Sequence, residues 1–370
     1  MHVIAAMSGG VDSAVAAALL LDAGHQVTGV FMRNGTQAGP RAAKGKQGCC
    51  SVDDAQDAAR VADLLDVPFY ALDFEAEFDT IVADFADEYA RGRTPNPCIQ
   101  CNRDLKFGRL MRFADAIGAD AVATGHYARC APEVRADADG LAPRHTLRIP
   151  TDEKKDQTYV LFPLAQETLA RTLFPLGELR KAEVRAIAAA RGLPVHEKPE
   201  SMEICFVPEG DYRAIVAQRR PDALQAGPVV VAESGAVVGE HAGIGAVTMG
   251  QRRGLGIASG TPLYVTGVDL ETNTVLVGER AELLRRVVEV DGWNAVSVLA
   301  PEMGGTLRGH ARVRRTHVPQ AAVAVGGARS GELSLHFDEP VAAPAPGQAL
   351  VLYDDDGRVL GGGWIHTSHA

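Results

Sequence analysis

Apolar runs and polar, glycine-bearing turns alternate along the first half of the chain. The apolar segment 2–7 precedes the polar turn 8–13 and an Ala- and Leu-rich segment at 14–21, which predicts a strand, a tight loop and a helix. Strands that alternate with helices predict a doubly wound α/β fold around a parallel sheet. Further strands are expected at 26–32, 68–73 and 121–126, helices at 51–65, 74–91 and 179–191, a loop at 33–48, and an irregular excursion or hairpin at 131–150.

The pattern changes beyond residue 208, where short valine-rich runs are separated by Gly, Pro and Asp. Such runs predict the strands of small β domains. We place three domains at 1–207, 208–285 and 286–370, so that two β-rich domains follow the α/β domain and the last is a β-barrel. The expected strands lie at 229–231, 246–248, 263–265, 275–277, 287–288, 333–335 and 349–353.

The polar turn after the first strand has the composition of a phosphate-binding loop. Gly9 and Gly10 permit unusual dihedrals, so backbone N–H groups and the positive start of the next helix can converge on an anion. The turn lacks the Lys of Walker loops, so we expect it to hold the pyrophosphate end of ATP while chemistry occurs at the α-phosphate. Asp12 is a candidate Mg²⁺ ligand, because this ion prefers few carboxylates plus phosphate oxygens. An ordinary strand-to-helix turn is the alternative.

Composition and charge narrow the class of protein. The chain has 370 residues, 46% of them hydrophobic, which suits two or three globular domains. No apolar run is long enough to span a membrane and the first strand leaves no room for a signal peptide, so we expect a cytoplasmic protein without a membrane partner. We also expect it to be a monomer when free. The net charge of −10 argues against indiscriminate nucleic-acid binding. An RNA site would be a local patch, for which the candidates are Arg308, Arg312, Arg314 and Arg315; a solvated arginine-rich face is the alternative.

Six cysteines in so long a chain do not form a disulfide scaffold and indicate a few reactive thiols or a metal site. Cys98 and Cys101 lie in the segment 94–102, which two prolines stiffen. We expect Asn102 to cap the next helix, which would put Cys101 at a helix N-terminus, where the dipole and basic neighbours favour a nucleophilic thiolate. A buried structural cysteine and a zinc ligand are the alternatives, although the second Cys-x-x-Cys pair of a zinc site is lacking.

Other polar residues lie where ligands bind in α/β folds. Gly125 ends the expected strand 121–126 at its carboxyl edge and would allow close approach of a nucleotide. His126 would face substrate, with an ordinary surface histidine as the alternative. Residues 155–157 place charged and amide side chains just before an apolar run that is expected to be helical. They are either ligand-contacting residues or the solvated start of that helix. Cys205 is expected to be either a core residue or the second thiol of a two-thiol mechanism.

The turn Ser8-Gly9-Gly10-Val11-Asp12-Ser13 resembles the PP-loop of the N-type ATP pyrophosphatases, which adenylate a carbonyl or carboxylate oxygen and release pyrophosphate. Over nearly its whole length the chain resembles the bacterial tRNA-specific 2-thiouridylases. The PP-loop is shared with many ligases, so the two cysteine segments and the C-terminal Gln and Gly signals are the narrower match. The matching segments are 8–13, 94–102, 124–126, 155–157, 204–206, 250–255, 346–348 and 360–363.

This resemblance implies ATP- and Mg²⁺-dependent thiolation at C2 of the wobble uridine (U34) in tRNAs for Lys, Glu and Gln. ATP would adenylate the C2 oxygen, and sulfur would arrive as a persulfide relayed by a sulfur-carrier protein. Cys205 would hold the persulfide, and Cys101 would attack it, freeing sulfide or closing a disulfide with Cys205. The resemblance assigns ATP contacts to Ala6, Met7, Ser8, Gly9, Gly10, Val11, Asp12, Ser13, Met32 and Gly125, target-base contacts to Asn96, Pro97 and Cys98, and tRNA contacts to His126, Lys155, Asp156, Gln157, Arg314, Arg315 and Gln348.

Cys98 departs from the pattern that we expect of this family, in which Asp occupies the position. Cys98 could act as a resolving thiol for Cys101, or the two could join Cys205 as ligands to three irons of a [4Fe–4S] cluster. The persulfide relay is favoured over the cluster, because Cys205 lies in a different segment.

Two other classes of protein stay open: another PP-loop enzyme, such as an amidating synthetase or a thiolase for another tRNA position, and a non-catalytic RNA-binding protein. Pyrophosphate release that depends on tRNA would separate them.

Overall fold

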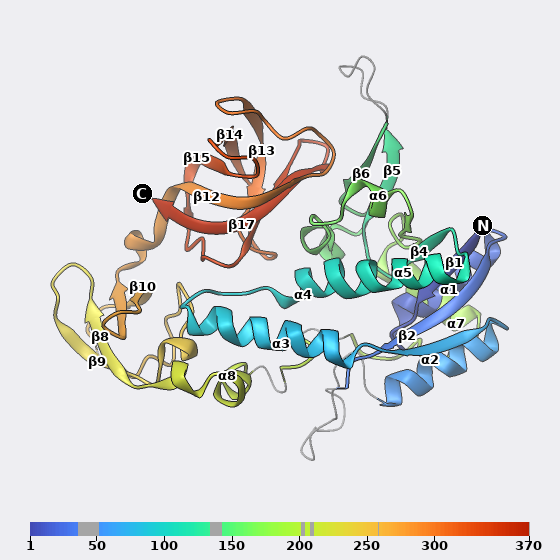
Figure 1. The fold of residues 1–370 in the computed structure, drawn as a ribbon, viewed down its shortest axis with the longest axis horizontal. Coiled ribbons are helices and arrows are strands. Elements are labelled where there is room, and N and C mark those ends of the chain that lie inside the picture. Colours follow the sequence, from blue (N-terminus) through green and yellow to red (C-terminus); the bar gives the residue numbers. More distant parts are fainter. Residues whose placement is uncertain (36–51, 134–142, 201–203, 208–210, 258, 370) are drawn as a thin grey trace.

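The computed structural model describes residues 1–35, 52–133, 143–200, 204–207, 211–257 and 259–369. Three bodies follow one another along the chain: an α/β domain, a small central sheet and a closed barrel (Figure 1). In this described part no helix is long and apolar enough to cross a membrane. The loop expected at 33–48 lies mostly outside the described residues.

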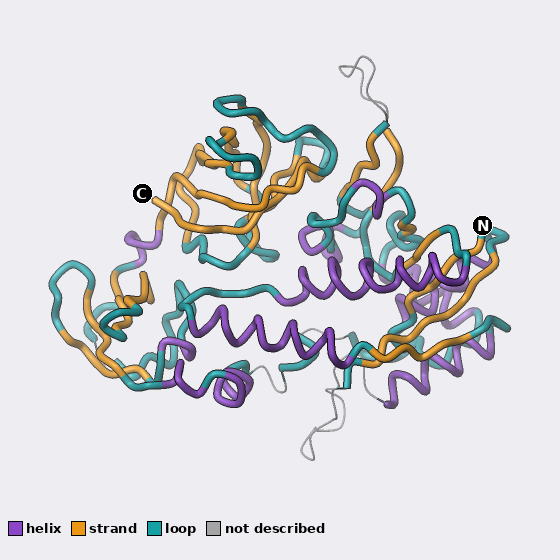
Figure 2. The backbone as a smooth tube through the Cα atoms, viewed as in Figure 1, coloured by secondary structure: helices purple, strands orange, loops and turns teal. Residues whose placement is uncertain are grey.

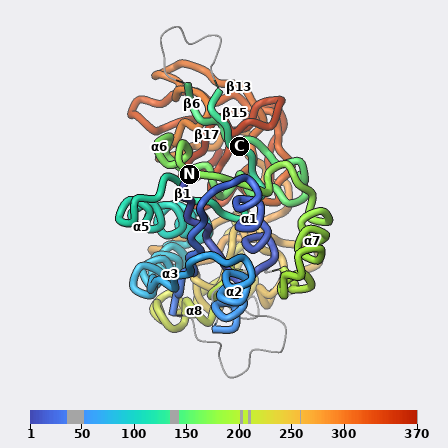
Figure 3. The backbone as a smooth tube through the Cα atoms, turned by 90° about the vertical axis from the view of Figure 1, so that its right-hand side faces the viewer, coloured from blue at the N-terminus to red at the C-terminus, as the bar shows by residue number. Residues whose placement is uncertain are grey.

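The first body is built on a five-stranded sheet in the order β3-β2-β1-β4-β7, in which every neighbouring pair is parallel. Two hydrophobic clusters cover its faces, with α1, α2 and α7 on one face and α3 and α5 on the other (Figure 3). The order reverses at β1 and β4, whose carboxyl ends therefore border a crevice. The elements are β1 (His2–Ala6), α1 (Val11–Asp22), β2 (Gln26–Arg33), α2 (Val52–Leu64), β3 (Phe69–Asp73), α3 (Glu75–Ala90), β4 (Ala121–Ala123), β7 (Thr172–Leu173) and α7 (Lys181–Ala190).

One continuous helix carries Cys98 and Cys101: α4 (Pro97–Gln100) runs into the π-helix η1 (Cys101–Arg109) and then α5 (Leu110–Ile117) (Figure 2). The expectation that Asn102 caps this helix was wrong. Pro97 takes the first helical position, where its missing N–H removes no intrahelical bond. Asn102 is buried and donates its side-chain amide to the carbonyl of Val160 at 3.2 Å. Cys101 is therefore the fifth helical residue, and it is Cys98 that lies in the first turn.

A hairpin and short turns connect β4 to β7. The antiparallel hairpin of β5 (Arg129–Glu133) and β6 (Arg144–Arg148) confirms one of the two forms expected for 131–150, although 134–142 lie outside the described residues. The apolar run after Gln157, expected to be helical, forms only a 3₁₀ turn, where Tyr159 is fully buried and donates its hydroxyl to the carbonyl of Ala349 in the barrel at 2.7 Å. The short helices here are η2 (Glu153–Lys155), η3 (Thr158–Val160) and α6 (Gln166–Leu169).

The central body has a four-stranded sheet in the order β10-β11-β8-β9. The strand expected at 246–248 was wrong, since a 3₁₀ helix occupies Ile244–Ala246. This turn packs tightly against helix α8, because a Cβ on Gly245 would lie only 2.9 Å from the Val216 side chain. The elements are α8 (Arg213–Arg219), η5 (Pro221–Leu224), β8 (Gly227–Val231), β9 (Val237–His241), η6 (Ile244–Ala246), β10 (Tyr264–Asp269), β11 (Thr274–Gly278) and η7 (Arg280–Leu283).

The last body is a closed barrel in the order β12-β15-β14-β13-β16-β17, so the α/β fold class followed by a β-rich part and a β-barrel is confirmed. The sequence pattern missed β17, because its run of glycines is unfavourable in strands. The glycines there fill a tight contact: a Cβ on Gly361 would lie 2.6 Å from Trp293. The strands are β12 (Leu284–Ala295), β13 (Thr306–Arg312), β14 (Gln320–Gly326), β15 (Leu333–Ala342), β16 (Ala349–Tyr353) and β17 (Val359–His369).

Candidate nucleotide and thiol site

The PP-loop turn follows β1 and is held rigidly from both sides. Gly9 has φ +73°, and a Cβ there would lie 2.2 Å from the carbonyl oxygen of Asp54 in the first turn of α2, so only glycine fits. Ser13 braces the loop from within, because its hydroxyl accepts from the Ser8 N–H at 3.1 Å and donates to the Gly10 carbonyl at 3.0 Å. The loop N–H groups and the start of α1 can therefore present a fixed cradle to a phosphate.

The turn after β4 packs directly on this loop. A Cβ on Gly125 would lie 2.8 Å from the backbone of Asp12 and Ser13. Met32, on β2, pairs in register with Leu72 of β3, and both side chains pack on the α3 and α5 side of the sheet together with Ala6. The residues expected to contact ATP thus gather at the carboxyl ends of β1, β2 and β4.

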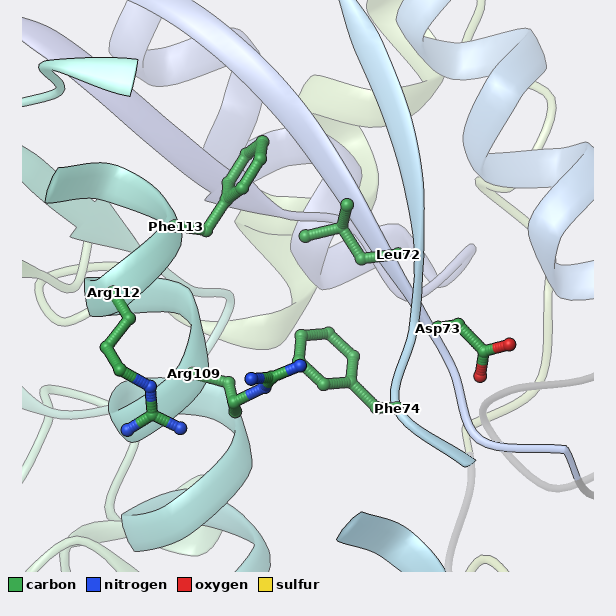
Figure 4. A pocket seen from close by; sticks show the side chains of 6 residues that line it. All are labelled: Leu72, Asp73, Phe74, Arg109, Arg112 and Phe113. Atoms are coloured by element: carbon green, nitrogen blue, oxygen red, sulfur yellow. The ribbon is translucent and has the colours of Figure 1, made fainter. Parts of the chain in front are cut away.

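A pocket of about 340 Å³ opens at the carboxyl end of β3 (Figure 4), and Leu72 in its lining pairs in register with Met32 of β2. The guanidinium of Arg109 lies 5.5 Å from the ring centre of Phe74 and pairs with Glu77 at 2.9 Å. The walls are apolar with cationic side chains beside them, which suits a flat aromatic ligand. The pocket is lined by Leu72, Asp73, Phe74, Arg109, Arg112 and Phe113.

Asp12 holds a cation that no sequence motif indicated. The ammonium of Lys181, the first residue of α7, contacts both carboxylate oxygens at 2.7 and 2.8 Å, and the Tyr127 hydroxyl donates to one of them at 2.8 Å. Burial, followed by the charge of Asp12, raises the pKa of Tyr127, so this hydroxyl remains a donor. A basic helix beginning near residue 179 was the only local signal for Lys181.

Glu200 extends this charge cluster to the segment 155–157. Its carboxylate pairs with Lys181 at 2.8 Å and with Lys155 at 2.5 Å. Burial alone would raise the pKa of Glu200, but hydrogen bonds from the two lysines outweigh it and hold the pKa at about 2. Acidic and basic side chains therefore alternate from Asp12 to Lys155.

Lys198 fastens the same segment to the PP-loop. Its ammonium donates to the Gly9 carbonyl at 2.9 Å, to Asp54 at 2.7 Å and to Asp57 at 2.6 Å. Burial opposes the charge, but the hydrogen bonds to the two carboxylates outweigh it and raise the pKa of Lys198. This lysine joins the loop, the start of α2 and the chain that leads to Cys205.

The two principal thiols lie against one hydrophobic cluster. Cys101 and Cys205 are both half-buried and pack on the cluster that contains α3. Phe206 anchors the Cys205 turn there, with its ring centre 5.1 Å from that of Phe85 and 5.6 Å from that of Phe78. The fold therefore brings two segments far apart in sequence to the same layer.

The cysteines form neither a disulfide nor a metal cluster in the part of the chain that the structure describes. None of Cys98, Cys101, Cys130 and Cys205 is disulfide-bonded, so the disulfide suggested by the resemblance is absent from this state. No three His, Cys, Asp or Glu side chains of the described ranges are grouped so as to hold a metal ion. Cys98, Cys101 and Cys205 therefore do not fit a three-cysteine cluster site as arranged here, and Cys49 and Cys50 lie outside the described residues.

The segment before α4 is held by the barrel. Gln348 donates its side-chain amide to the carbonyls of Thr94 and Pro95 at 3.0 and 3.4 Å, and the Thr94 N–H donates to Pro346 at 2.8 Å. These bonds position Asn96, Pro97 and Cys98. Cys98 is exposed, Asn96 is half-buried and Pro97 is buried.

Several residues expected to contact tRNA are engaged inside the protein. His126 is 6% exposed, its ring bonds the Thr124 hydroxyl at 2.7 Å, and burial holds its pKa well below the usual range. The Asp156 carboxylate is buried and pairs with Arg312 of the barrel at 2.6 Å. Arg314 and Arg315, by contrast, are exposed. The exposed arginines can reach RNA as they stand, whereas His126 and Asp156 support the fold.

The fold and this site define a PP-loop nucleotide-binding protein with an appended barrel. Protein-family models agree: tRNA methyl transferase HUP domain matches residues 1–209, tRNA methyl transferase PRC-barrel domain 213–279, and Aminomethyltransferase beta-barrel domain 289–365. A solved 4-thiouridine synthetase–RNA complex with bound ATP aligns with 60% of this chain and 50% of that chain at 16% identity and a TM-score of 0.36.

Full-length relatives narrow the class further. The tRNA-specific 2-thiouridylase MnmA of Roseiflexus sp. (strain RS-1) is 46% identical, with 98% of each chain covered. The protein of the same description from Geobacter metallireducens is 47% identical over 99% of this chain and 97% of its own. The chain belongs to the tRNA-specific 2-thiouridylase family.

Proposed function

We propose that this protein replaces the C2 oxygen of U34 in tRNA by sulfur, at the expense of ATP. The observation that carries the proposal is full-length similarity to 2-thiouridylases in a chain whose fold unites a PP-loop with two half-buried thiols on one core layer. The family-model descriptions name methyl transfer, but a PP-loop without a Walker lysine suits release of pyrophosphate, not methyl chemistry.

ATP would bind along the carboxyl ends of β1, β2 and β4. The loop from Ala6 to Ser13 would hold the phosphates, Gly125 would border them, and adenine would lie beside Met32, in the pocket of Leu72 and Phe113. Asp12 fits a Mg²⁺ ion, since its carboxylate already holds a cation, the Lys181 ammonium, and such an ion would neutralise phosphate charge.

Sulfur would be delivered by the two thiols. A sulfur-carrier protein would leave Cys205 as a persulfide, and the Cys101 thiolate would attack the Cys205 sulfur. That attack forms the Cys101–Cys205 disulfide and releases hydrosulfide, which displaces AMP from the adenylated C2. A cellular dithiol would then reduce the disulfide and return both thiols.

The RNA would meet the protein on the exposed side of the same elements. Asn96, Pro97 and Cys98 would contact the target base, which an anticodon loop presents already unpaired. Lys155, Gln157 and the arginine pair 314–315 would contact the backbone, with tRNAs for Lys, Glu and Gln as the substrates. His126, Asp156 and Gln348 would act by holding these contact segments in place.

Nucleoside analysis by mass spectrometry tests the function. tRNA from a deletion strain should lack 2-thiouridine at position 34, and the gene should restore it while Cys101→Ala and Cys205→Ala should not. Normal 2-thiouridine in the deletion strain would refute the proposal.

Purification without oxygen tests the persulfide relay against a cluster. We expect protein without stoichiometric iron or acid-labile sulfide that thiolates tRNA from a persulfide donor. A stoichiometric cluster that is lost in Cys98→Ala would overturn the relay.

A further inference from the structure

Two paths of polar contacts join the segment 155–157 to Asp12 in the PP-loop. One path passes through charges: Lys155 contacts Glu200 at 2.5 Å, Glu200 contacts Lys181 at 2.8 Å, and Lys181 contacts Asp12 at 2.7 Å. The other passes through Tyr127, whose ring centre lies 5.8 Å from the Lys181 ammonium, so the two paths lie side by side before they meet at Asp12.

The second path is neutral and well buried. The Tyr127 hydroxyl donates to Asp12 at 2.8 Å, and its backbone N–H donates to the side-chain oxygen of Gln157 at 2.8 Å. The Gln157 N–H in turn donates to the Tyr127 carbonyl at 3.1 Å, which closes a ring of two bonds. Tyr127 is only 3% exposed, and its backbone is bonded to the backbone of Gln157, so the link is shielded from solvent.

We infer that Glu200 is a positioning residue that couples ATP binding at Asp12 to the binding of a tRNA phosphate at Lys155, and that the coupling is positive. This inference rests on the proposed function. The structural reason is that the Glu200 carboxylate is shared by two ammonium groups: Lys181, which also pairs with Asp12, and Lys155, which lies in the segment expected to meet RNA.

The sign follows from the alternation of charges. A divalent cation that takes Asp12 displaces Lys181, which then neutralises Glu200 more fully. Glu200 then attracts Lys155 less strongly, so Lys155 becomes available to an RNA phosphate. Run in reverse, a phosphate that takes Lys155 leaves Lys181 to Glu200 and leaves Asp12 open to the cation, as reciprocity of coupling requires.

Partial burial strengthens the interaction between Lys181 and Glu200, through which the coupling would be transmitted. The Lys181 side chain is 12% exposed and that of Glu200 26%, so solvent screens this pair less than a surface pair. Glu200 also lies between Lys198, which is bonded to the PP-loop, and the turn that carries Cys205.

Equilibrium titration measures the coupling without turnover. The dissociation constant of magnesium α,β-methylene-ATP, which cannot release pyrophosphate, is measured with and without a saturating unmodified transcript of a tRNA bearing U34. In the wild-type protein the tRNA should lower this constant at least about fivefold, and the nucleotide should tighten tRNA binding by the same factor. In Glu200→Gln the factor should fall below about twofold.

Two variants complete the test. Glu178→Gln removes an equal charge whose side chain is 72% exposed and 3.7 Å from Arg129, and it should keep the wild-type factor. Tyr127→Phe cuts the neutral path without removing a charge and should give an intermediate factor. Thermal unfolding of each variant confirms that it is folded.

The outcomes separate this inference from the proposed function. If neither nucleotide nor tRNA binds, the proposed function fails. If both bind but the wild-type factor is one, or Glu200→Gln keeps the full factor, the inference is overturned while the function stands. Equal weakening of both affinities in Glu200→Gln, with the factor unchanged, would show that Glu200 serves only the fold.

Discussion

Replacing Arg312 by Met should loosen the barrel from the α/β domain. Arg312 lies on β13, and its guanidinium reaches Asp156 at 2.6 Å, with side-chain exposures of 18% and 4%. Asp156 also accepts from the Thr158 N–H at 2.9 Å and hydroxyl at 2.7 Å, and Arg312 lies 4.9 Å from the ring centre of Tyr353. Both oxygens of the carboxylate thus have protein partners, and little of it meets solvent.

The expected magnitude follows from leaving that carboxylate buried without its counter-charge. Removing one partner of a buried ion pair costs about 3–5 kcal/mol, because the desolvation penalty of the other is no longer offset. Arg312→Met combined with Asp156→Asn removes both charges and keeps an acceptor for Thr158, so it should cost less than Arg312→Met alone. The double-mutant cycle should return a coupling energy of about 2–3 kcal/mol.

Tryptophan fluorescence during urea unfolding is the appropriate assay. The chain has two tryptophans, Trp293 and Trp364, both in barrel strands, and the ring of Trp364 lies 6.0 Å from Phe162 of the α/β domain. The signal therefore reports the barrel and its docking face.

A surface pair on the same strand supplies the control. Arg308 and Asp338 pair at 2.7 Å with exposures of 67% and 47%, so Arg308→Met should cost less than about 1 kcal/mol. If Arg312→Met lowers the free energy of unfolding no more than Arg308→Met does, or if the effects of Arg312→Met and Asp156→Asn simply add, the buried pair does not hold the barrel in place.

Four other measurements test the site. Asp12→Ala should slow pyrophosphate release at least about a hundredfold yet not weaken tRNA binding in the absence of ATP, and release near the wild-type rate would refute its role. Replacing Arg314 and Arg315 by Ala should weaken tRNA binding and lower its salt slope by about one for each phosphate that the protein no longer neutralises, whereas an unchanged slope would mark a merely solvated face. Gln348→Ala should slow tRNA-dependent pyrophosphate release and thiolation together, because its bonds hold the segment whose residues would contact the target base; an unchanged rate of pyrophosphate release would contradict this. The low pKa of Glu200, about 2, stabilises the fold above its unfolded value near 4.5, and this stabilisation is lost as pH falls toward 2. Glu200→Gln should therefore reduce the acid sensitivity measured by urea unfolding between pH 7 and 3, by about 1 kcal/mol once screening by solvent is allowed for; an unaltered pH profile would exclude this contribution.

Local patterns were sufficient to predict most of the sheet and the loop. Four of the five strands of the parallel sheet are short apolar runs between turn residues and were predicted, whereas the two-residue β7 was missed; the positive φ of Gly9 is what a glycine after a strand suggests. The start of the helix that carries Cys101 was misplaced because the cap propensity of Asn102 outweighed the equally local signal of Pro97 at a first helical position. Burial of Asn102 against Val160 is a tertiary effect that no local pattern contains.

The charge network could not be read from the sequence, since its bonds join residues far apart along the chain. Lys181 lies 169 residues from Asp12, and Lys198 lies 189 residues from Gly9. In sequence each is one more lysine near a helix or a turn. Only the docking of α7 on α1 and of the 198–200 segment on α2 makes them ligands of the loop.

The same docking gives the PP-loop a cation that its own sequence lacks. In a Walker loop the lysine comes from the loop itself, whereas here Lys181 enters from a helix later in the chain and pairs with both Asp12 and Glu200. Lys181 is shared between two carboxylates, so its position can shift from Asp12 to Glu200. Glu200 also pairs with Lys155, in the segment expected to meet RNA. The barrel fixes the other end of that segment through Asp156 and the segment before Cys98 through Gln348. The barrel therefore contacts both the segment that is bonded to Glu200 and the segment that carries Cys98 and Cys101, so a change in the docking of the barrel should affect both.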